Sequence, residues 1–155
     1  TWSEATPLPA PRPGLPPKVR LSLPATGNRA EGRAGLRAAL RGADALLISS
    51  PEYAHGVPGS LKNMLDWVVG SGELVGKPVA LLQASPYGSY VRAALLETLA
   101  VMEGRVVEAA SRSLSFGTNR ISAEQIAGEP RFAEVVRAAV AALVQAAVAD
   151  RGEGA

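Results

Sequence analysis

The sequence contains no cysteine and only one histidine, His55, among its 155 residues. Without cysteine there is no disulfide, no thiolate nucleophile and no cysteine-ligated metal. A metal ion at His55 would need carboxylates or water for all its other ligands, so we predict no metal site. The sequence also lacks a strong excess of positive or negative charge, because its net charge is only +2. We therefore expect no nucleic-acid partner.

Long apolar runs are missing as well. No stretch approaches the ~18 apolar residues that span a bilayer, and the first residues lack the apolar core of a signal peptide. We therefore expect a cytoplasmic protein with no membrane partner.

Proline is unevenly distributed along the chain. Six of the twelve prolines lie in residues 1–17. Proline fixes φ and removes a backbone donor that a helix or central strand needs, so residues 1–17 are predicted to form an extended arm. The remaining residues, 18–155, are long enough for one domain with a buried core.

Strand-like and helix-like patterns alternate after this arm. Short apolar or alternating runs predict strands at residues 19–23, 45–49 and 79–83, and Val106-Val107 begins another. Apolar residues at helical spacing predict helices between and after them, with stripes at Leu36 and Leu40, at Leu61, Met64, Leu65 and Val68, at Val91, Leu95, Leu99 and Met102, and at residues 132–147. This order predicts an α/β protein with a parallel sheet and right-handed crossovers.

Two loops carry the candidate binding residues. The first, residues 49–59 (SSPEYAHGVPG), follows one predicted strand and combines small, rigid and polar residues. The second, residues 85–90 (SPYGSY), follows the next predicted strand and holds two aromatic rings. In an open parallel sheet, ligands bind outside the carboxyl ends of the strands, so both loops are predicted to lie at a binding edge.

The longer stretch ADALLISSPEYAHGVPGSLKNMLDW, residues 43–67, is similar to a segment of the NAD(P)H-dependent FMN reductases, a flavodoxin-like family that includes chromate, quinone and azo reductases. The stretch GKPVALLQASPYG, residues 76–88, resembles the family's next strand and second flavin loop. The resemblance covers roughly residues 21–107 and implies a flavodoxin-like three-layer α/β/α sandwich with a parallel sheet.

The same resemblance implies FMN bound noncovalently, with the isoalloxazine ring against both loops. The implied cofactor-binding residues are Pro51, Glu52, Tyr53 and His55 in the first loop and Ser85, Pro86, Tyr87 and Gly88 in the second. Two departures from the family are visible: Ala54 stands where the family often has asparagine, and Ser89-Tyr90 stands where it commonly has Gly-Gly. Access of the nicotinamide above the ring is expected to differ accordingly.

The resemblance further implies an enzyme that passes electrons from NADPH or NADH through bound FMN to a flavin, quinone, azo compound or metal oxyanion. Hydride transfer between nicotinamide and flavin is the cofactors' own chemistry, so no catalytic side chain is predicted. A homodimer or homotetramer through the helix at residues 61–67 is also implied, and Trp67 agrees because aromatic residues are enriched at interfaces. A surface ion pair between Lys62 and Asp66 is the alternative for this helix.

A row of arginines recurs every four residues along the first predicted helix, at Arg29, Arg33, Arg37 and Arg41. Such a row could attract the 2′-phosphate of NADPH. A helix face exposed to solvent is the preferred interpretation, because charged runs usually face water.

One part of the family pattern is missing. The family's phosphate-binding loop reads like Gly-Ser-x-Arg followed by Ser and Asn, and no such motif occurs in this sequence. If residues 19–23 form the family's second strand, the N-terminal strand, its helix and the phosphate loop are absent or replaced by the proline-rich arm. Losing a central strand is expected to expose two sheet edges.

Three explanations of this gap stay open. The sequence lacks its true N-terminus, or the arm or a partner chain fills the gap in a divergent enzyme. Alternatively, the chain is a truncated or divergent non-catalytic domain that acts in oligomeric or partner interactions. We favour a reductase-derived fold.

Overall fold

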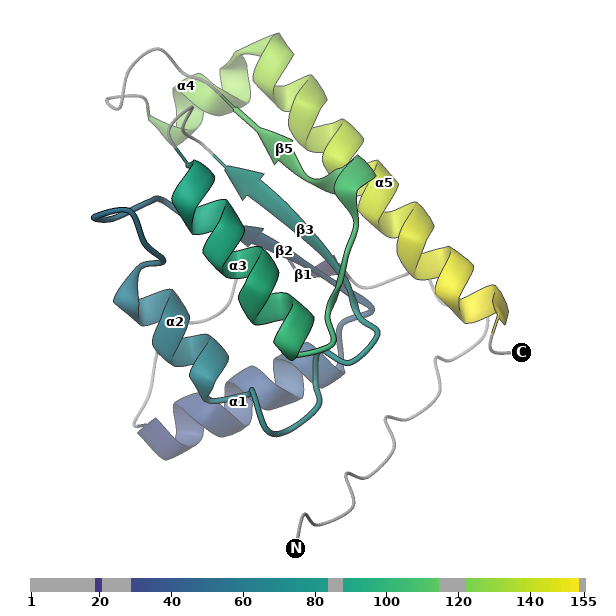
Figure 1. The fold of residues 1–155 in the computed structure, drawn as a ribbon. Helices are drawn as coiled ribbons and strands as arrows, with labels where there is room; N and C mark the ends of the chain where they lie inside the picture. Colours follow the sequence, from purple (N-terminus) through teal and green to yellow (C-terminus); the bar gives the residue numbers. More distant parts are fainter. Residues whose placement is uncertain (1–18, 21–28, 84–87, 115–121, 154–155) are drawn as a thin grey trace, which may run out of the picture.

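The structure, a computed structural model, describes residues 19–20, 29–83, 88–114 and 122–153. Its centre is one sheet of five strands, β1 (Val19–Arg20), β2 (Ala45–Ser49), β3 (Pro78–Gln83), β4 (Arg105–Val106) and β5 (Arg112–Ser113). The strands β1 to β4 are neighbours in this order, and β5 pairs with β3 further along (Figure 1). All these pairings are parallel, as the sequence predicts.

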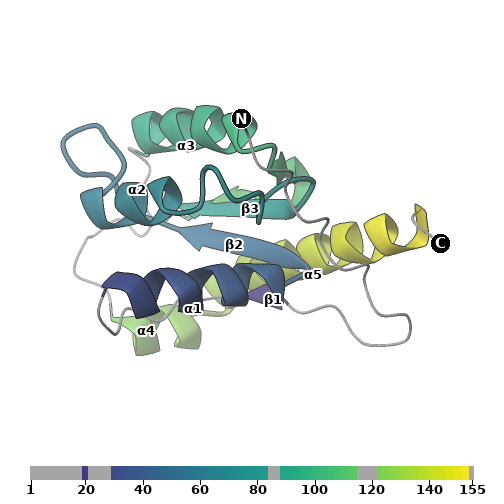
Figure 2. The same cartoon turned by 90° about the horizontal axis from the view of Figure 1, so that it is seen from below.

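Helices cover both faces of the sheet. The helices α1 (Arg29–Arg41), α2 (Gly59–Asp66) and α3 (Ser89–Val101) pack on one face, and α4 (Ala123–Gly128) and α5 (Pro130–Glu153) pack on the other (Figures 1 and 2). Alternate strand residues serve the two cores: Leu46, Ile48, Val79 and Leu81 face α1 to α3, whereas Ala45, Leu47, Ala80 and Leu82 face α5. Burial on both faces explains why these strands read as continuous apolar runs.

Several elements begin and end as their patterns predict. β2 has the predicted bounds, and β3 begins one residue earlier than predicted, at Pro78. The helix α1 contains the predicted stripe of Leu36 and Leu40 and runs along the whole row of arginines from Arg29 to Arg41. Gly42 follows α1 directly, and its N–H still makes a helical hydrogen bond, to the Ala38 carbonyl at 3.0 Å. The predicted stripe of α3 is buried as a whole, at Val91, Leu95, Leu99 and Met102.

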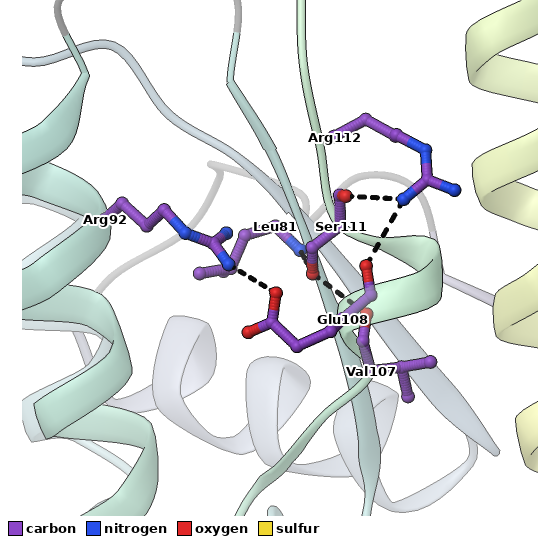
Figure 3. Close-up of polar contacts among 6 residues, drawn as sticks. All are labelled: Leu81, Arg92, Val107, Glu108, Ser111 and Arg112. Atoms are coloured by element: carbon purple, nitrogen blue, oxygen red, sulfur yellow. Dashed lines mark hydrogen bonds and ion pairs between the residues drawn. The ribbon is translucent and has the colours of Figure 1, made fainter.

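The strand predicted to begin at Val106-Val107 is interrupted. β4 ends at Val106, a 3-10 turn, η1 (Glu108–Ala110), follows, and the chain returns to the sheet as β5. Across this interruption, the Ser111 hydroxyl accepts a hydrogen bond from the Leu81 N–H at 3.1 Å and donates one to the Val107 carbonyl at 3.0 Å (Figure 3). A side chain thus satisfies a backbone donor of β3 that has no ladder partner there.

The described part of the predicted strand 19–23 is β1, and it lies directly beside β2. Val19 pairs with Ala45, and Arg20 pairs with Leu46. We expected an exposed sheet edge because a central strand would be missing. This expectation is wrong at Ala45 and Leu46, because β1 pairs with both residues. The predicted proline-rich arm, residues 1–17, lies outside the described residues.

The helix α5 corrects one expectation about apolar runs. Its stretch Pro130–Asp150 has 21 residues and contains an 18-residue window with a mean hydropathy of 1.7, so by length and composition alone it could cross a membrane. In the fold, one side of this stretch packs against the sheet, with Phe132, Ala139, Leu143 and Ala147 buried there. Such a helix is weak evidence for a membrane span, because the cover of a sheet has the same apolar character.

Candidate functional site

The first loop leaves the sheet at the carboxyl end of β2, and its tip is a two-residue turn. The Tyr53 N–H donates to the Gly56 carbonyl at 3.1 Å, and the Gly56 N–H donates to the Tyr53 carbonyl at 2.9 Å. Between them, Ala54 and His55 have φ values of 48° and 60°. This is a type I′ turn, which favours Asn or Gly at positions of positive φ. The family's asparagine at position 54 would suit this backbone, whereas alanine adopts it under strain.

The tip of this loop presents binding groups to solvent. Tyr53 is 65% exposed, and Pro51 and His55 are exposed as well. In the described part of the chain, the N–H groups of Ala54 and His55 donate no hydrogen bond. An exposed aromatic ring beside two backbone N–H groups that have no acceptor among the described residues suits a planar ligand with acceptor atoms at its rim.

Glu52 joins the first loop to the start of α3. Its Oε2 accepts hydrogen bonds from the Tyr90 and Val91 N–H groups, each at 3.0 Å. The residue before α3, Gly88, has no side chain to cap these amides. A carboxylate at this end of a helix satisfies free donors and interacts favourably with the helix dipole. Glu52, predicted to bind the cofactor, therefore directs one carboxylate oxygen to the protein itself.

A ring pair makes a second link between the first loop and α3. The His55 and Tyr90 rings are stacked, with centroids 4.2 Å apart and planes 16° from parallel. Tyr90 is nevertheless 54% exposed. Tyr90 is one of the residues at which the sequence departs from the family pattern, and His55 directly follows another, Ala54. The pair is thus a feature of this chain's own loops.

The second loop is described only at its end. Ser85, Pro86 and Tyr87 lie outside the described residues, and Gly88 is buried. The Gly88 carbonyl accepts a hydrogen bond from the side-chain amide of Gln83, the buried last residue of β3. Sequence reasoning did not single out Gln83, although a polar residue that ends an otherwise apolar strand is a usable signal.

Two arginines of α1 lie away from the two candidate loops and pair with a buried carboxylate. Arg37 and Arg41 pair with the fully buried Glu73 at 2.7 and 3.0 Å, and Ser71 also donates to this carboxylate. Burial by itself raises the pKa of Glu73, but the hydrogen bonds from Ser71 and Arg37 outweigh it, so this pKa lies below its ordinary value of 4.5. The two arginines are thus engaged within the chain, which disfavours their use as a 2′-phosphate site.

Lys77 lies in the same region, directly before β3. Its ammonium group donates to the Ala43 carbonyl and is buried. Burial lowers the pKa of Lys77, and the charges of Asp44 and Glu73 partly oppose this effect. These charges gather at the amino ends of β2 and β3, the edge opposite the two candidate loops.

A parallel sheet between helix layers, with an aromatic loop at the carboxyl edge, defines a flavodoxin-like α/β protein. Two solved structures share the fold. The flavoenzyme NAD(P)H:(acceptor) oxidoreductase FerB of Paracoccus denitrificans has a TM-score of 0.56 at 24% identity, over 77% of this chain and 69% of that one. An oxidoreductase of Corynebacterium diphtheriae has a TM-score of 0.51 at 21% identity, over 79% and 62%.

The profile of NADPH-dependent FMN reductase matches residues 13–119, and the chain belongs to this family. A quinone reductase of Escherichia coli (strain K12) is 47% identical over 51 residues, which are 32% of this chain and 27% of that protein. An NADPH azoreductase of Bacillus sp. (strain OY1-2) is 40% identical over 53 residues, 34% of this chain and 29% of that protein. The matched stretch therefore spans less than a third of these relatives.

FMN and NAD(P)H are the cofactors of this family. The described residues fit the ring of FMN, because Tyr53 and the two turn amides offer an exposed aromatic face and hydrogen-bond donors at the carboxyl edge. The segment that follows β1, residues 21–28, lies outside the described residues.

Proposed function

We propose that this chain is the flavin-ring-binding core of an FMN-dependent NAD(P)H oxidoreductase whose electron acceptor is a flavin, a quinone, an azo compound or a metal oxyanion. The observation that carries the proposal is the exposed Tyr53 turn at the carboxyl end of β2. The names of the quinone reductase and azoreductase relatives support the class of acceptor.

In this proposal FMN supplies the ring that accepts hydride from the nicotinamide, and the chain supplies the position of that ring. Tyr53 would lie against the flavin, because aromatic rings stack favourably. The Ala54 and His55 amides would donate to acceptor atoms at the rim of the ring. Donors held in place before reaction stabilise the negative charge that reduction brings. The two hydrogen bonds between Tyr53 and Gly56 close the turn that carries these donors.

The test is flavin binding followed by turnover. The purified chain is mixed with FMN, separated from free flavin by gel filtration, and its visible spectrum and rate of NADPH oxidation are recorded with a quinone as acceptor. We expect a yellow protein with turnover. A colourless protein without turnover would favour the alternative, a non-catalytic domain that acts through partner interactions.

Two variants make this test specific to the loop. Tyr53→Ala removes the exposed ring and is expected to weaken FMN binding by ~tenfold, since stacking on one aromatic ring contributes on the order of 1 kcal/mol. Val101→Ala is the matched control, because Val101 is 77% exposed near the end of α3, at the opposite edge of the sheet. Equal FMN affinity for both variants would contradict the assignment of Tyr53.

We also propose that α2 contributes to a homodimer or homotetramer. The helix buries Leu65 within the chain, and Val69 just after it is 52% exposed. The Lys62 ammonium lies 2.5 Å from the Asp66 carboxylate, so the alternative surface pair is formed as well. Light scattering of the chain and of Val69→Asp tests whether this side of α2 is an interface. If it is, we expect the unmodified chain to form an oligomer and the variant to lose it.

A further inference from the structure

We infer that Glu52 is a positioning residue that holds the first loop and the start of α3 at a fixed separation, rather than a residue that contacts the flavin. The contacts of Glu52 stand by themselves, and only their effect on flavin binding rests on the proposed function. The geometry is a single carboxylate oxygen shared by two consecutive amides, Tyr90 and Val91, each at 3.0 Å.

The chemistry of these contacts makes them a strong link. The first turn of α3 contains no acidic residue, and its N-cap makes no side-chain hydrogen bond. Glu52 therefore supplies from another segment the negative charge that a helix start favours. Hydrogen bonds to an ionised acceptor are about twice as strong as neutral ones. Glu52 is also partly buried, which limits competition from water.

Two other contacts end at the same short segment, residues 88–91. The Gln83 amide holds the Gly88 carbonyl, so the end of β3 is attached there. The His55 ring stacks on Tyr90, so the tip of the first loop is attached there as well. The first loop and the strand that leads into the second loop thus share one anchor. A ligand that contacts both loops would require this separation to be correct.

If Glu52 positions the first loop, removing its carboxylate should weaken the binding of the flavin ring. Loss of the Glu52 carboxylate would let the first loop move relative to α3, which disturbs contacts to the isoalloxazine ring. Contacts to the FMN phosphate would not change. FMN and riboflavin should therefore lose affinity by the same factor. Damage to a phosphate contact would instead affect FMN alone.

The experiment compares three variants of the whole chain. Glu52→Ala removes both hydrogen bonds, and Glu52→Gln keeps an acceptor oxygen without the charge. Glu97→Gln is the matched control, because Glu97 is an exposed acidic residue of the same helix. Amide hydrogen exchange is measured without flavin, and dissociation constants are measured for FMN and riboflavin.

In Glu52→Ala we expect faster exchange in residues 51–56 as well as in 89–92, and ~tenfold weaker binding of both flavins, which corresponds to about 1.4 kcal/mol. Glu52→Gln should lie between Glu52→Ala and wild type, and Glu97→Gln should match wild type. Faster exchange confined to residues 89–92 would overturn the inference, because Glu52 would then be only a helix cap. A loss of FMN affinity without a loss of riboflavin affinity would also overturn it.

The two proposals fail in different ways. If wild type binds neither flavin, the proposed function is wrong, and the exchange measurement still decides whether Glu52 links the first loop to α3. If wild type binds flavin and Glu52→Ala binds FMN and riboflavin as tightly as wild type does, the proposed function stands and the positioning role is wrong.

Discussion

The hydroxyl of Ser111 accepts a hydrogen bond from the Leu81 N–H at 3.1 Å, in the middle of the sheet (Figure 3). On this side of β3, β4 is paired with Pro78 and Val79, whereas β5 is paired with Leu82 and Gln83. Leu81 lies between these two groups and is buried. The serine hydroxyl therefore lets the turn η1 interrupt the strand without leaving a buried donor unsatisfied.

Replacing Ser111 with alanine should destabilise the fold. The variant leaves the Leu81 N–H buried without its acceptor, which costs ~1–3 kcal/mol. Urea unfolding followed by circular dichroism measures this difference. Ser60→Ala is the matched control, because Ser60 is exposed on α2 and its loss is expected to change stability by less than ~0.5 kcal/mol. Equal stability of Ser111→Ala and Ser60→Ala would show that another group, such as water, satisfies Leu81.

The sequence predicts the sheet and its helices well because their signals are local. Strand 45–49 follows from its short apolar run and the first helix from the spacing of Leu36 and Leu40, and the structure confirms both. The interruption at η1 could not be predicted, since Val106-Val107 is apolar in the manner of a strand. The hydrogen bond that compensates for this interruption joins Ser111 to Leu81, 30 positions apart in the sequence. Hydrophobic periodicity carries no information about such distant contacts.

The candidate site was predictable in place but not in its internal links. Pro51, Tyr53 and His55 lie at the predicted carboxyl edge. The role of Glu52 depends on amides 38 and 39 residues away, and the motif alone does not separate a ligand contact from a helix cap. The strain at Ala54 could not be seen either, because the backbone conformation of the turn is known only from the structure.

Replacing Ala54 with glycine should stabilise the chain. Its φ of 48° lies in the left-handed region, which costs a non-glycine residue ~1–2 kcal/mol. Glycine loses more entropy on folding, so the expected net gain is about 0.5–1 kcal/mol. The same substitution at Ala38, exposed within α1, should have the opposite sign and destabilise by ~1 kcal/mol. Thermal unfolding of both variants is the measurement, and a loss of stability in Ala54→Gly would contradict the turn geometry.

Glu73 should make the stability of the chain depend on pH in the acid range. Its pKa in the folded protein lies below the ordinary value of 4.5, because hydrogen bonds from Ser71 and Arg37 outweigh the effect of burial. The stabilisation is therefore complete above the unfolded pKa and is lost as the pH falls through the lower, folded pKa. Denaturant unfolding between neutral pH and the acid range measures this loss.

The variant Glu73→Gln isolates this contribution. At neutral pH we expect a loss of ~1–3 kcal/mol, because a buried acceptor is replaced and Arg37 and Arg41 keep their charges. The difference from wild type should shrink as the pH falls below 4.5, where wild type loses the same charge. Glu134→Gln, on the exposed side of α5, provides the control. A difference that stays constant with pH would exclude Glu73 as the titrating group.

The last prediction concerns α5, whose apolar character the structure assigns to packing on the sheet. Leu143 is 0% exposed, whereas Val148, five residues later on the same helix, is 50% exposed. Leu143→Ala should therefore cost ~2–5 kcal/mol through lost burial and the cavity that remains. Val148→Ala should change stability by less than ~0.5 kcal/mol. Urea unfolding in buffer without lipid or detergent compares the two variants. Similar stabilities would mean that α5 does not pack on the sheet through Leu143, and its apolar composition would then need another explanation.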